Sequence, residues 1–119
     1  MNFRGNISYL EDSDFNSAGV FKYPGRYIVM IYGDFCGHCH KMKPVFQAAA
    51  DSYSGNVQWA AIQLDGMRAS EKKLGERVQQ IIGNIDFKGV PMVVMIENGR
   101  VSKEFQGPRE KVSLIEFCS

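Results

Sequence analysis

The sequence predicts an α/β domain in which helices cover both faces of a mixed central sheet. Segments with the composition of β-strands alternate with segments whose apolar residues recur at helical spacing. Strands joined through helices favour parallel pairing, and Asn98-Gly99 is a strong signal for an antiparallel hairpin. A chain of 119 residues can bury one core without disulfide bonds, so we expect a single domain over residues 1–119.

Composition and charge exclude several kinds of partner. Apolar residues make up 45% of the chain and charged residues 23%, which is typical of a soluble globular domain. A net charge of +1 provides no electrostatic footprint for nucleic acid or an anionic membrane, so neither is expected as a partner. No apolar run approaches the ~20 residues of a membrane span, no signal-peptide core is visible, and the last residues are not an ER-retention tail. We expect a cytoplasmic monomer, unless a leader has been removed.

The first predicted elements lead to one strand that is buried on both faces. Asn6–Leu10 alternates weakly and predicts an edge strand. The oxygens of residues 12–14 can cap a short helix that reaches to about Gly19, and Pro24-Gly25 marks a turn. Tyr27–Tyr32 is continuously apolar and rich in β-formers, as expected for a central strand.

Two helices and a strand are predicted next. The first helix has an apolar face from Met42 to Tyr53, and Gly55 is expected to end it. A strand is predicted from about Val57 to Leu64. Ser70 is expected to cap a longer helix. The apolar stripe of that helix consists of Leu74, Val78, Ile81, Ile82 and Ile85.

The C-terminal third completes the predicted sheet. Met92–Ile96 predicts a buried strand, and Val101–Gln106 should pair with it in the antiparallel hairpin. A last amphipathic helix begins near Glu110. We expect this helix to bury Val112, Ile115 and Phe117. The complete order is β-α-β-α-β-α-β-β-α, which predicts three layers of helices, sheet and helices.

Two of the three cysteines stand at the start of a predicted helix. An odd number of cysteines favours one reactive pair and a third cysteine without a catalytic role over a set of structural disulfides. We expect Cys118 to be that third cysteine. Cys36 follows the buried strand closely, where the unpaired N–H groups of a first helical turn favour a thiolate. We therefore predict Cys36 as the nucleophile and Cys39, one turn further and more buried, as the resolving thiol. His38 can donate a hydrogen bond or a positive charge toward the Cys36 sulfur.

Phe35-Cys36-Gly37-His38-Cys39, with Pro44 five residues later, resembles the thioredoxin superfamily, and Cys-Gly-His-Cys in particular resembles the catalytic domains of protein disulfide isomerase. Lys88-Gly89-Val90-Pro91 before a strand matches the second signature of that family, so the resemblance covers nearly the whole chain. It implies a thioredoxin-like three-layer fold, a cis Val90–Pro91 bond opposite the cysteines, and a Val90 backbone that binds an extended substrate. It also implies that Gly37 belongs to the catalytic motif, that Phe35 is an aromatic shield on the substrate side, and that Pro44 is structural.

The chain departs from the family pattern in several places. The buried carboxylate that serves the resolving thiol as a proton acceptor is replaced by Met30, and its companion lysine by Ala61. The loss of both the carboxylate and the lysine is energetically reasonable, because either charge alone would be buried and unpaired. Phe35 stands where tryptophan is more common. Arg109 resembles an arginine of protein disulfide isomerase that modulates the resolving cysteine; an exposed arginine at a helix start is the alternative. The longer segment 65–91 is expected to extend the third helix.

We expect dithiol–disulfide exchange with protein substrates through Cys36 and Cys39, without a bound cofactor. Electrons would come from, or go to, a partner reductase or oxidant. Because His38 favours the reduced form, it predicts a disulfide that is more oxidising than that of Cys-Gly-Pro-Cys thioredoxins. The physiological direction and the identity of the substrate stay open.

Three other functions compete with exchange. Cys36 to His40 also fits the C-x-x-C-H motif for haem attachment, but that function leaves Val90-Pro91 unexplained. A structural zinc site would use Cys36 and Cys39 with His38 or His40, yet the distant Cys118 is the only remaining thiol for a fourth ligand. A redox-inert binding module is the third alternative, although inert members of the family typically lose one of the two cysteines.

Overall fold

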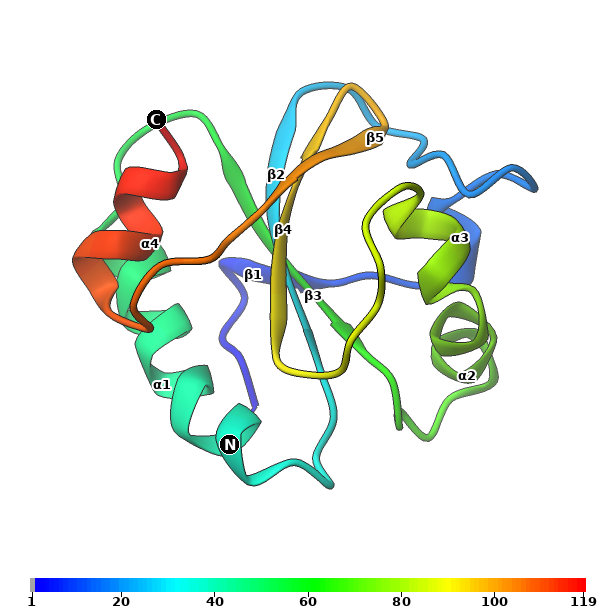
Figure 1. Cartoon of the computed structure of the whole chain (residues 1–119), viewed down its shortest axis with the longest axis horizontal. Helices are drawn as coiled ribbons and strands as arrows, with labels where there is room; N and C mark the ends of the chain where they lie inside the picture. Colours follow the sequence, from blue (N-terminus) through cyan, green and yellow to red (C-terminus); the bar gives the residue numbers. More distant parts are fainter. Residues whose placement is uncertain (1) are drawn as a thin grey trace.

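A five-stranded sheet separates two layers of helices in the computed structural model, which describes residues 2–119 (Figure 1). The strands are β1 (Ile7–Tyr9), β2 (Arg26–Tyr32), β3 (Gln58–Gln63), β4 (Met92–Glu97) and β5 (Arg100–Glu104). Their spatial order is β1-β3-β2-β4-β5. β1, β3 and β2 run parallel, whereas β4 is antiparallel to β2 and β5 to β4. The predicted α/β class with a mixed sheet is confirmed.

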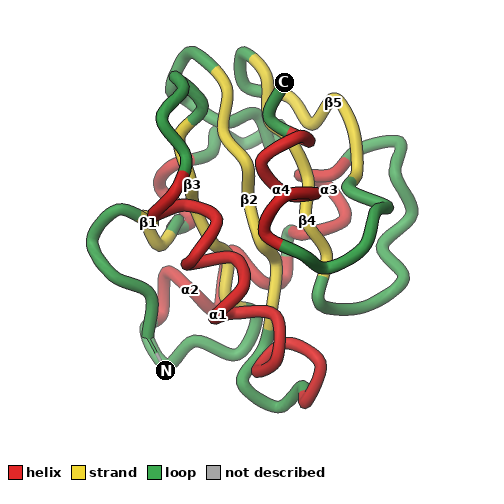
Figure 2. The backbone as a smooth tube through the Cα atoms, turned by 90° about the vertical axis from the view of Figure 1, so that its left-hand side faces the viewer, coloured by secondary structure: helices red, strands yellow, loops and turns green. Residues whose placement is uncertain are grey.

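Each face of the sheet is covered by two helices. α1 (Gly37–Ser52) and α4 (Lys111–Phe117) contact each other on one face and lie in front of the strands in Figure 2. α2 (Ala69–Glu76) and α3 (Val78–Ile82) cover the opposite face (Figure 1). A short 3-10 helix, η1 (Asp12–Asp14), precedes β2. Among residues 2–119, no helix combines the length and the apolar character that crossing a membrane would require.

β2 is the central strand because its side chains contribute to two separate cores. Ile28 and Met30 pack with residues of α1 and α4, whereas Val29 and Ile31 pack with residues of α2 and α3. All four side chains are 0% exposed, and burying one such side chain stabilises the fold by about 1.5–3 kcal/mol. Burial on both faces therefore explains the uninterrupted apolar run of this strand.

The direction of β4 differs from the expectation that helix-joined strands pair in parallel. The segment from Gly83 to Pro91 carries the chain from the end of α3 back along the sheet (Figure 1). β4 therefore starts near the beginning of α1 and runs opposite to β2, with Met30 paired to Val93. This return brings the Val90 carbonyl to the first cysteine, 3.6 Å from its sulfur.

The helix expected from residues 12–14 to Gly19 is wrong, because only the three residues of η1 are helical. The side-chain oxygen of Asn16 accepts hydrogen bonds from the N–H groups two and four residues later, at 2.9 and 3.0 Å. Such local bonds stabilise a turn in competition with a helix. Gly19 has a positive φ of 82° within this turn, and Phe15 and Phe21 then form an isolated antiparallel bridge.

The long third helix expected from the apolar stripe is also wrong, because the chain forms α2 and α3 instead. Arg68 takes the N-cap position that was expected for Ser70. The helix is interrupted at Arg77, whose backbone has φ −104° and ψ 7° and whose guanidinium donates to Asp12 at 2.7 Å. Ile85 lies beyond α3 and is half-buried. The break in this helical segment therefore coincides with a contact between Arg77 and η1.

The last helix buries a different face from the predicted one. Leu114 is the buried side chain of α4, at 0% exposure, and the C-cap residue Cys118, four residues later, is buried at 4% exposure. Val112 is 61% exposed, and the other two predicted residues, Ile115 and Phe117, are half-buried. α4 has only seven residues, so its contact with α1 sets which side is covered.

Candidate active site

Cys36 lies at the N-terminus of α1, where a tight turn holds it after β2. The Cys36 N–H donates to the Gly33 carbonyl at 3.2 Å and closes this turn, which starts one residue after the last residue of β2, Tyr32. Cys36 has an extended backbone (φ −105°, ψ 118°) and is the N-cap of the helix. The first cysteine therefore stands where the N–H groups of the first helical turn lack backbone partners.

The Cys36 sulfur has two polar neighbours. It accepts a hydrogen bond from the backbone N–H of Cys39 at 3.2 Å, and its thiol donates to the carbonyl oxygen of Val90 at 3.6 Å. The N–H contact favours a thiolate, because hydrogen bonds to a charged acceptor are stronger. The carbonyl contact is made only by the protonated thiol. Cys36 is half-buried, so part of the residue is exposed to solvent.

Cys39 is 0% exposed and lies within the first turn of α1. Burial raises the pKa of its thiol to about 12, and the hydrogen bond with Cys36 adds to the rise. The Gly33 backbone and the charge of Arg109 lower the pKa and offset part of this rise. Cys39 is therefore a neutral thiol near pH 7, and an attack by its sulfur would first require removal of the proton.

The raised pKa of Cys39 predicts a steep pH dependence for the resolution of a mixed disulfide. Only the thiolate attacks, and its fraction rises about tenfold per pH unit below the pKa. We expect the rate constant for release of a substrate bound to Cys36 to rise about tenfold from pH 7 to pH 8, and to keep rising toward pH 10. Rapid mixing of the reduced protein with a chromogenic disulfide measures this rate. A rate independent of pH over that interval would contradict the assignment of Cys39.

The loop before β4 faces the cysteine pair. The Val90–Pro91 peptide bond is cis. Pro91 lines a cavity of about 180 Å³ together with Met42, Phe105 and Arg109. This cavity brings the exposed Arg109 from the segment before α4 to the site, where its charge lowers the pKa of Cys39.

The other predicted site residues lie on the solvent side. Phe35 is 71% exposed, and its ring covers Gly33 so closely that a Cβ at that position would collide with it. Gly37 and His38 are exposed at the start of α1. The hydrogen bonds of residues 2–119 include none from the His38 ring, so the predicted contact with the Cys36 sulfur is not formed in this conformation.

Met30 and Ala61 are directly paired across β2 and β3. Both are 0% exposed and belong to the same core cluster as Cys39. This register agrees with the expectation that Met30 and Ala61 replace a carboxylate and its companion lysine. A thioether and a methyl group fill the place where the family has an acid and a base, so neither position can accept a proton from Cys39.

The sequence analysis missed a polar network around Asp34. Lys43 of α1, Gln63 of β3 and Asp65 after β3 all bind this residue. Partial burial raises the pKa of Asp65, but hydrogen bonds from the backbone N–H groups of Asp34 and Phe35 and from Gln63 outweigh it and lower the pKa. The only signal for this network in the sequence is Lys43, a charged residue within the apolar face of the helix that forms α1.

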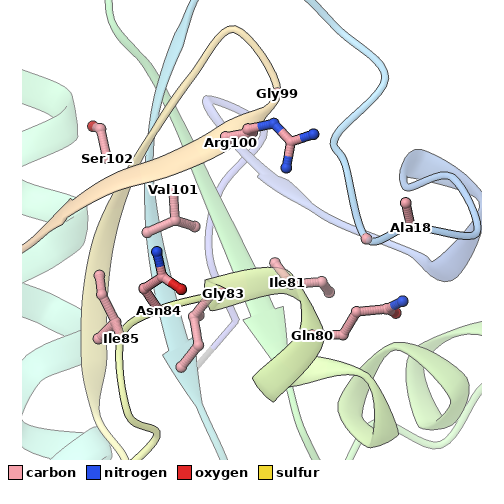
Figure 3. Close-up of a pocket in the computed structure, with 12 residues that line it drawn as sticks. Ala18, Gln80, Ile81, Gly83, Asn84, Ile85, Gly99, Arg100, Val101 and Ser102 are labelled. Atoms are coloured by element: carbon pink, nitrogen blue, oxygen red, sulfur yellow. The ribbon is translucent and has the colours of Figure 1, made fainter.

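Other parts of the surface lie apart from the cysteines. A cavity of about 340 Å³ lies between α3 and the β4–β5 hairpin, and Gln80, Asn84 and Arg100 are among its lining residues (Figure 3). The helix α3 covers the sheet face opposite to α1 (Figure 1). In the part of the chain that the structure describes, residues 2–119, no three His, Cys, Asp or Glu side chains gather to hold a metal ion.

The sheet order, the cysteines at the start of α1 and the Val90–Pro91 loop beside them define a thioredoxin-like domain. A sequence model of the family described as Thioredoxin matches residues 6–119. The chain therefore belongs to the thioredoxin family. It is 31% identical over 113 residues to the thioredoxin-like protein 453L of Invertebrate iridescent virus 6, and the match covers 82% of this chain and 80% of that protein.

Protein disulfide isomerases are also similar to this chain. Identity is 29% over 92 residues with the protein disulfide-isomerase of Ricinus communis and 28% over 104 residues with protein disulfide-isomerase A3 of Gallus gallus. These matches cover 76% and 87% of this chain but only 17% and 18% of the two relatives.

Two solved structures illustrate the likeness in fold. The J-Trx1 fragment of ERdj5 aligns with a TM-score of 0.70 at 21% identity, and the match covers 95% of this chain and 50% of that one. Form II of human ERp44 aligns with a TM-score of 0.68 at 18% identity, over 98% of this chain and 30% of that one. At these identities the likeness supports the fold alone.

Proposed function

We propose that this chain is a thiol–disulfide oxidoreductase that acts on protein substrates through Cys36 and Cys39. Membership of the thioredoxin family supports this class of activity. The observation that carries the proposal is the hydrogen bond from the Cys39 N–H to the Cys36 sulfur at the helix start. It favours the thiolate at Cys36, while its neighbour stays buried and protonated. One sulfur can then attack first and the other second.

The reaction moves two electrons between cysteine pairs. In the reducing direction the Cys36 thiolate attacks a substrate disulfide, so that one substrate sulfur leaves as a thiolate and a mixed disulfide forms. Cys39 then loses its proton and attacks the Cys36 sulfur, which releases the second substrate thiolate and leaves a Cys36–Cys39 disulfide. The substrate is reduced and the pair oxidised. The same steps in reverse oxidise a substrate dithiol, and a partner reductase or oxidant resets the pair.

The reduction potential decides which direction the chain favours. We expect it to exceed that of thioredoxin, because the exposed His38, which makes no hydrogen bond to the Cys36 sulfur, can still bring a positive charge to the helix start and so favour the reduced form. Thioredoxin and protein disulfide isomerase differ by about 90 mV, or roughly 4 kcal/mol for two electrons. Equilibrating the protein in glutathione buffers and counting alkylated thiols by mass measures the potential. A value at or below that of thioredoxin would remove the oxidising assignment and leave a reductase.

The same titration separates exchange from a redox-inert binding module. An inert module would show no reversible disulfide between Cys36 and Cys39 at any glutathione ratio. The cytoplasmic location expected from the sequence stays a prediction. In that reducing compartment a potential near that of protein disulfide isomerase would need a dedicated oxidant as partner.

A further inference from the structure

Lys43 is a buried cation that the exchange reaction does not use. Its side chain is 3% exposed, and the residue lies on α1 one helical turn after Cys39. The ammonium lies 4.7 Å from the centroid of the Tyr32 ring and 5.6 Å from that of Phe3. Such cation–π contacts offset part of the loss of hydration. A charge in this position nevertheless needs a counter-charge.

Asp34 provides that counter-charge. Its Oδ1 lies 3.4 Å from the Lys43 nitrogen, and this is the only ion pair of Lys43 within residues 2–119. The Asp34 side chain is 55% exposed, so the pair joins a buried cation to a carboxylate at the surface. Removal of the carboxylate would leave Lys43 buried and unpaired, whereas removal of both charges would leave no unpaired charge.

Four residues hold Asp34 through polar contacts. Its N–H donates to Asp65 at 3.0 Å, and its carbonyl accepts from His40 Nε2 at 2.7 Å. Its second carboxylate oxygen accepts from Gln63 Nε2 at 3.0 Å. Together with Lys43, these partners come from α1, from β3 and from the loop after β3. They fix the backbone and the side chain of this one residue against two elements.

The fixed residue lies in the turn that presents the nucleophile. Asp34 and Phe35 are the two central residues between Gly33 and Cys36, and the bond from Cys36 N–H to the Gly33 carbonyl closes the turn. The Phe35 N–H also donates to Asp65 at 3.2 Å. The direction of the Cys36 sulfur toward the Cys39 N–H therefore depends on how firmly Asp34 is held.

We infer that Lys43 is a positioning residue for thiol–disulfide exchange, because its buried ammonium anchors Asp34 and thereby the turn that carries Cys36. This inference rests on the proposed function. The ease with which Cys39 forms a bond to Cys36 depends on the alignment of the two sulfurs, and small misalignments reduce intramolecular reactivity strongly. Loosening the turn should therefore lower the effective concentration of one thiol toward the other.

Lys43→Met tests this inference with Lys41→Met as the matched control. Lys41 is exposed on the same helix, so the control removes the same charge without touching the turn. We expect the equilibrium constant for Cys36–Cys39 bridge formation against glutathione to fall about tenfold in Lys43→Met and to stay within about twofold in Lys41→Met. Equal constants in the two variants would overturn the inference.

Thermal unfolding separates positioning from stability. Methionine fills the site between the two aromatic rings without a buried charge, so we expect Lys43→Met to melt at or above the wild-type temperature. Asp34→Asn should melt lower, because it leaves Lys43 unpaired, and the double variant Asp34→Asn/Lys43→Met should recover the loss. A positioning role predicts that the double variant regains the wild-type melting temperature while its equilibrium constant for Cys36–Cys39 bridge formation stays about tenfold below that of the wild type. Recovery of both would show that Lys43 acts on stability alone.

If Lys43→Met fails to fold, the bridge-formation constant is measured in the double variant instead, because that variant contains no unpaired charge. The wild-type protein distinguishes this inference from the proposed function. If the wild type forms no reversible bridge, the proposed function fails. If the wild type forms the bridge and Lys43→Met matches Lys41→Met, only the positioning role fails.

Discussion

Cys39→Ser protein mixed with a disulfide-bonded protein substrate is expected to accumulate as a stable mixed disulfide through Cys36. The half-buried Cys36 still attacks, since it keeps its place as N-cap of α1. A serine hydroxyl is not a competent nucleophile toward a disulfide, so the second step stops. Turnover should fall roughly a thousandfold or more. Non-reducing electrophoresis and intact mass measure the adduct.

Two variants make this result specific. Cys36→Ser should give no adduct, because Cys39 is 0% exposed and is protonated near neutral pH. Cys118→Ser should exchange at the wild-type rate, since Cys118 is buried in the core at the C-cap of α4, where burial raises the pKa of its thiol to about 11. An adduct formed by Cys36→Ser and not by Cys39→Ser would reverse the assigned roles.

Met30→Glu is expected to destabilise the fold and to accelerate resolution of the mixed disulfide near neutral pH. Met30 is 0% exposed in the core cluster that contains Cys39. A carboxylate placed there has no charged partner at the paired position, Ala61, so burial should lower the free energy of unfolding by about 2–5 kcal/mol. The same burial raises the pKa of the new carboxyl, which makes it a better proton acceptor for Cys39.

Denaturant unfolding and rapid mixing measure the two effects of Met30→Glu. Resolution should become faster at pH 7 and less steep in its dependence on pH, because a fixed base replaces hydroxide. Met30→Gln is the control: it introduces a polar group of the same size that cannot accept the proton, so it should destabilise without acceleration. Adding Ala61→Lys should recover part of the stability, since the two positions are paired across β2 and β3. A resolution rate for Met30→Glu that is equal to or below that of the wild type at pH 7 would refute the role of a carboxylate at this position as proton acceptor for Cys39.

Much of the site could be predicted from local patterns in the sequence. The apolar run of β2 predicts a strand buried on both faces, and Cys36 four residues after it begins the next helix. Asn98 and Gly99 have positive φ angles of 50° and 91°, as a two-residue hairpin requires. These features depend on a few consecutive residues, which the sequence displays directly.

Tertiary contacts override local signals where a segment is short or weakly apolar. Ser70 has the side chain of an N-cap, but Arg68 takes that position. The break at Arg77 coincides with the ion pair of this residue with Asp12, which is remote in sequence. In α4 the contact with α1 selects Leu114 as the buried residue and leaves Val112 exposed.

The order of residues by itself determined the reactive pair, the strand before it and the alternation of elements, because hydrophobic period and helix-start chemistry are local. Only the tertiary structure decided that β4 runs antiparallel to β2, that the Val90 carbonyl reaches the Cys36 sulfur, and that Lys43 holds Asp34. These contacts join residues that no periodic pattern relates, and packing of the whole chain selects them.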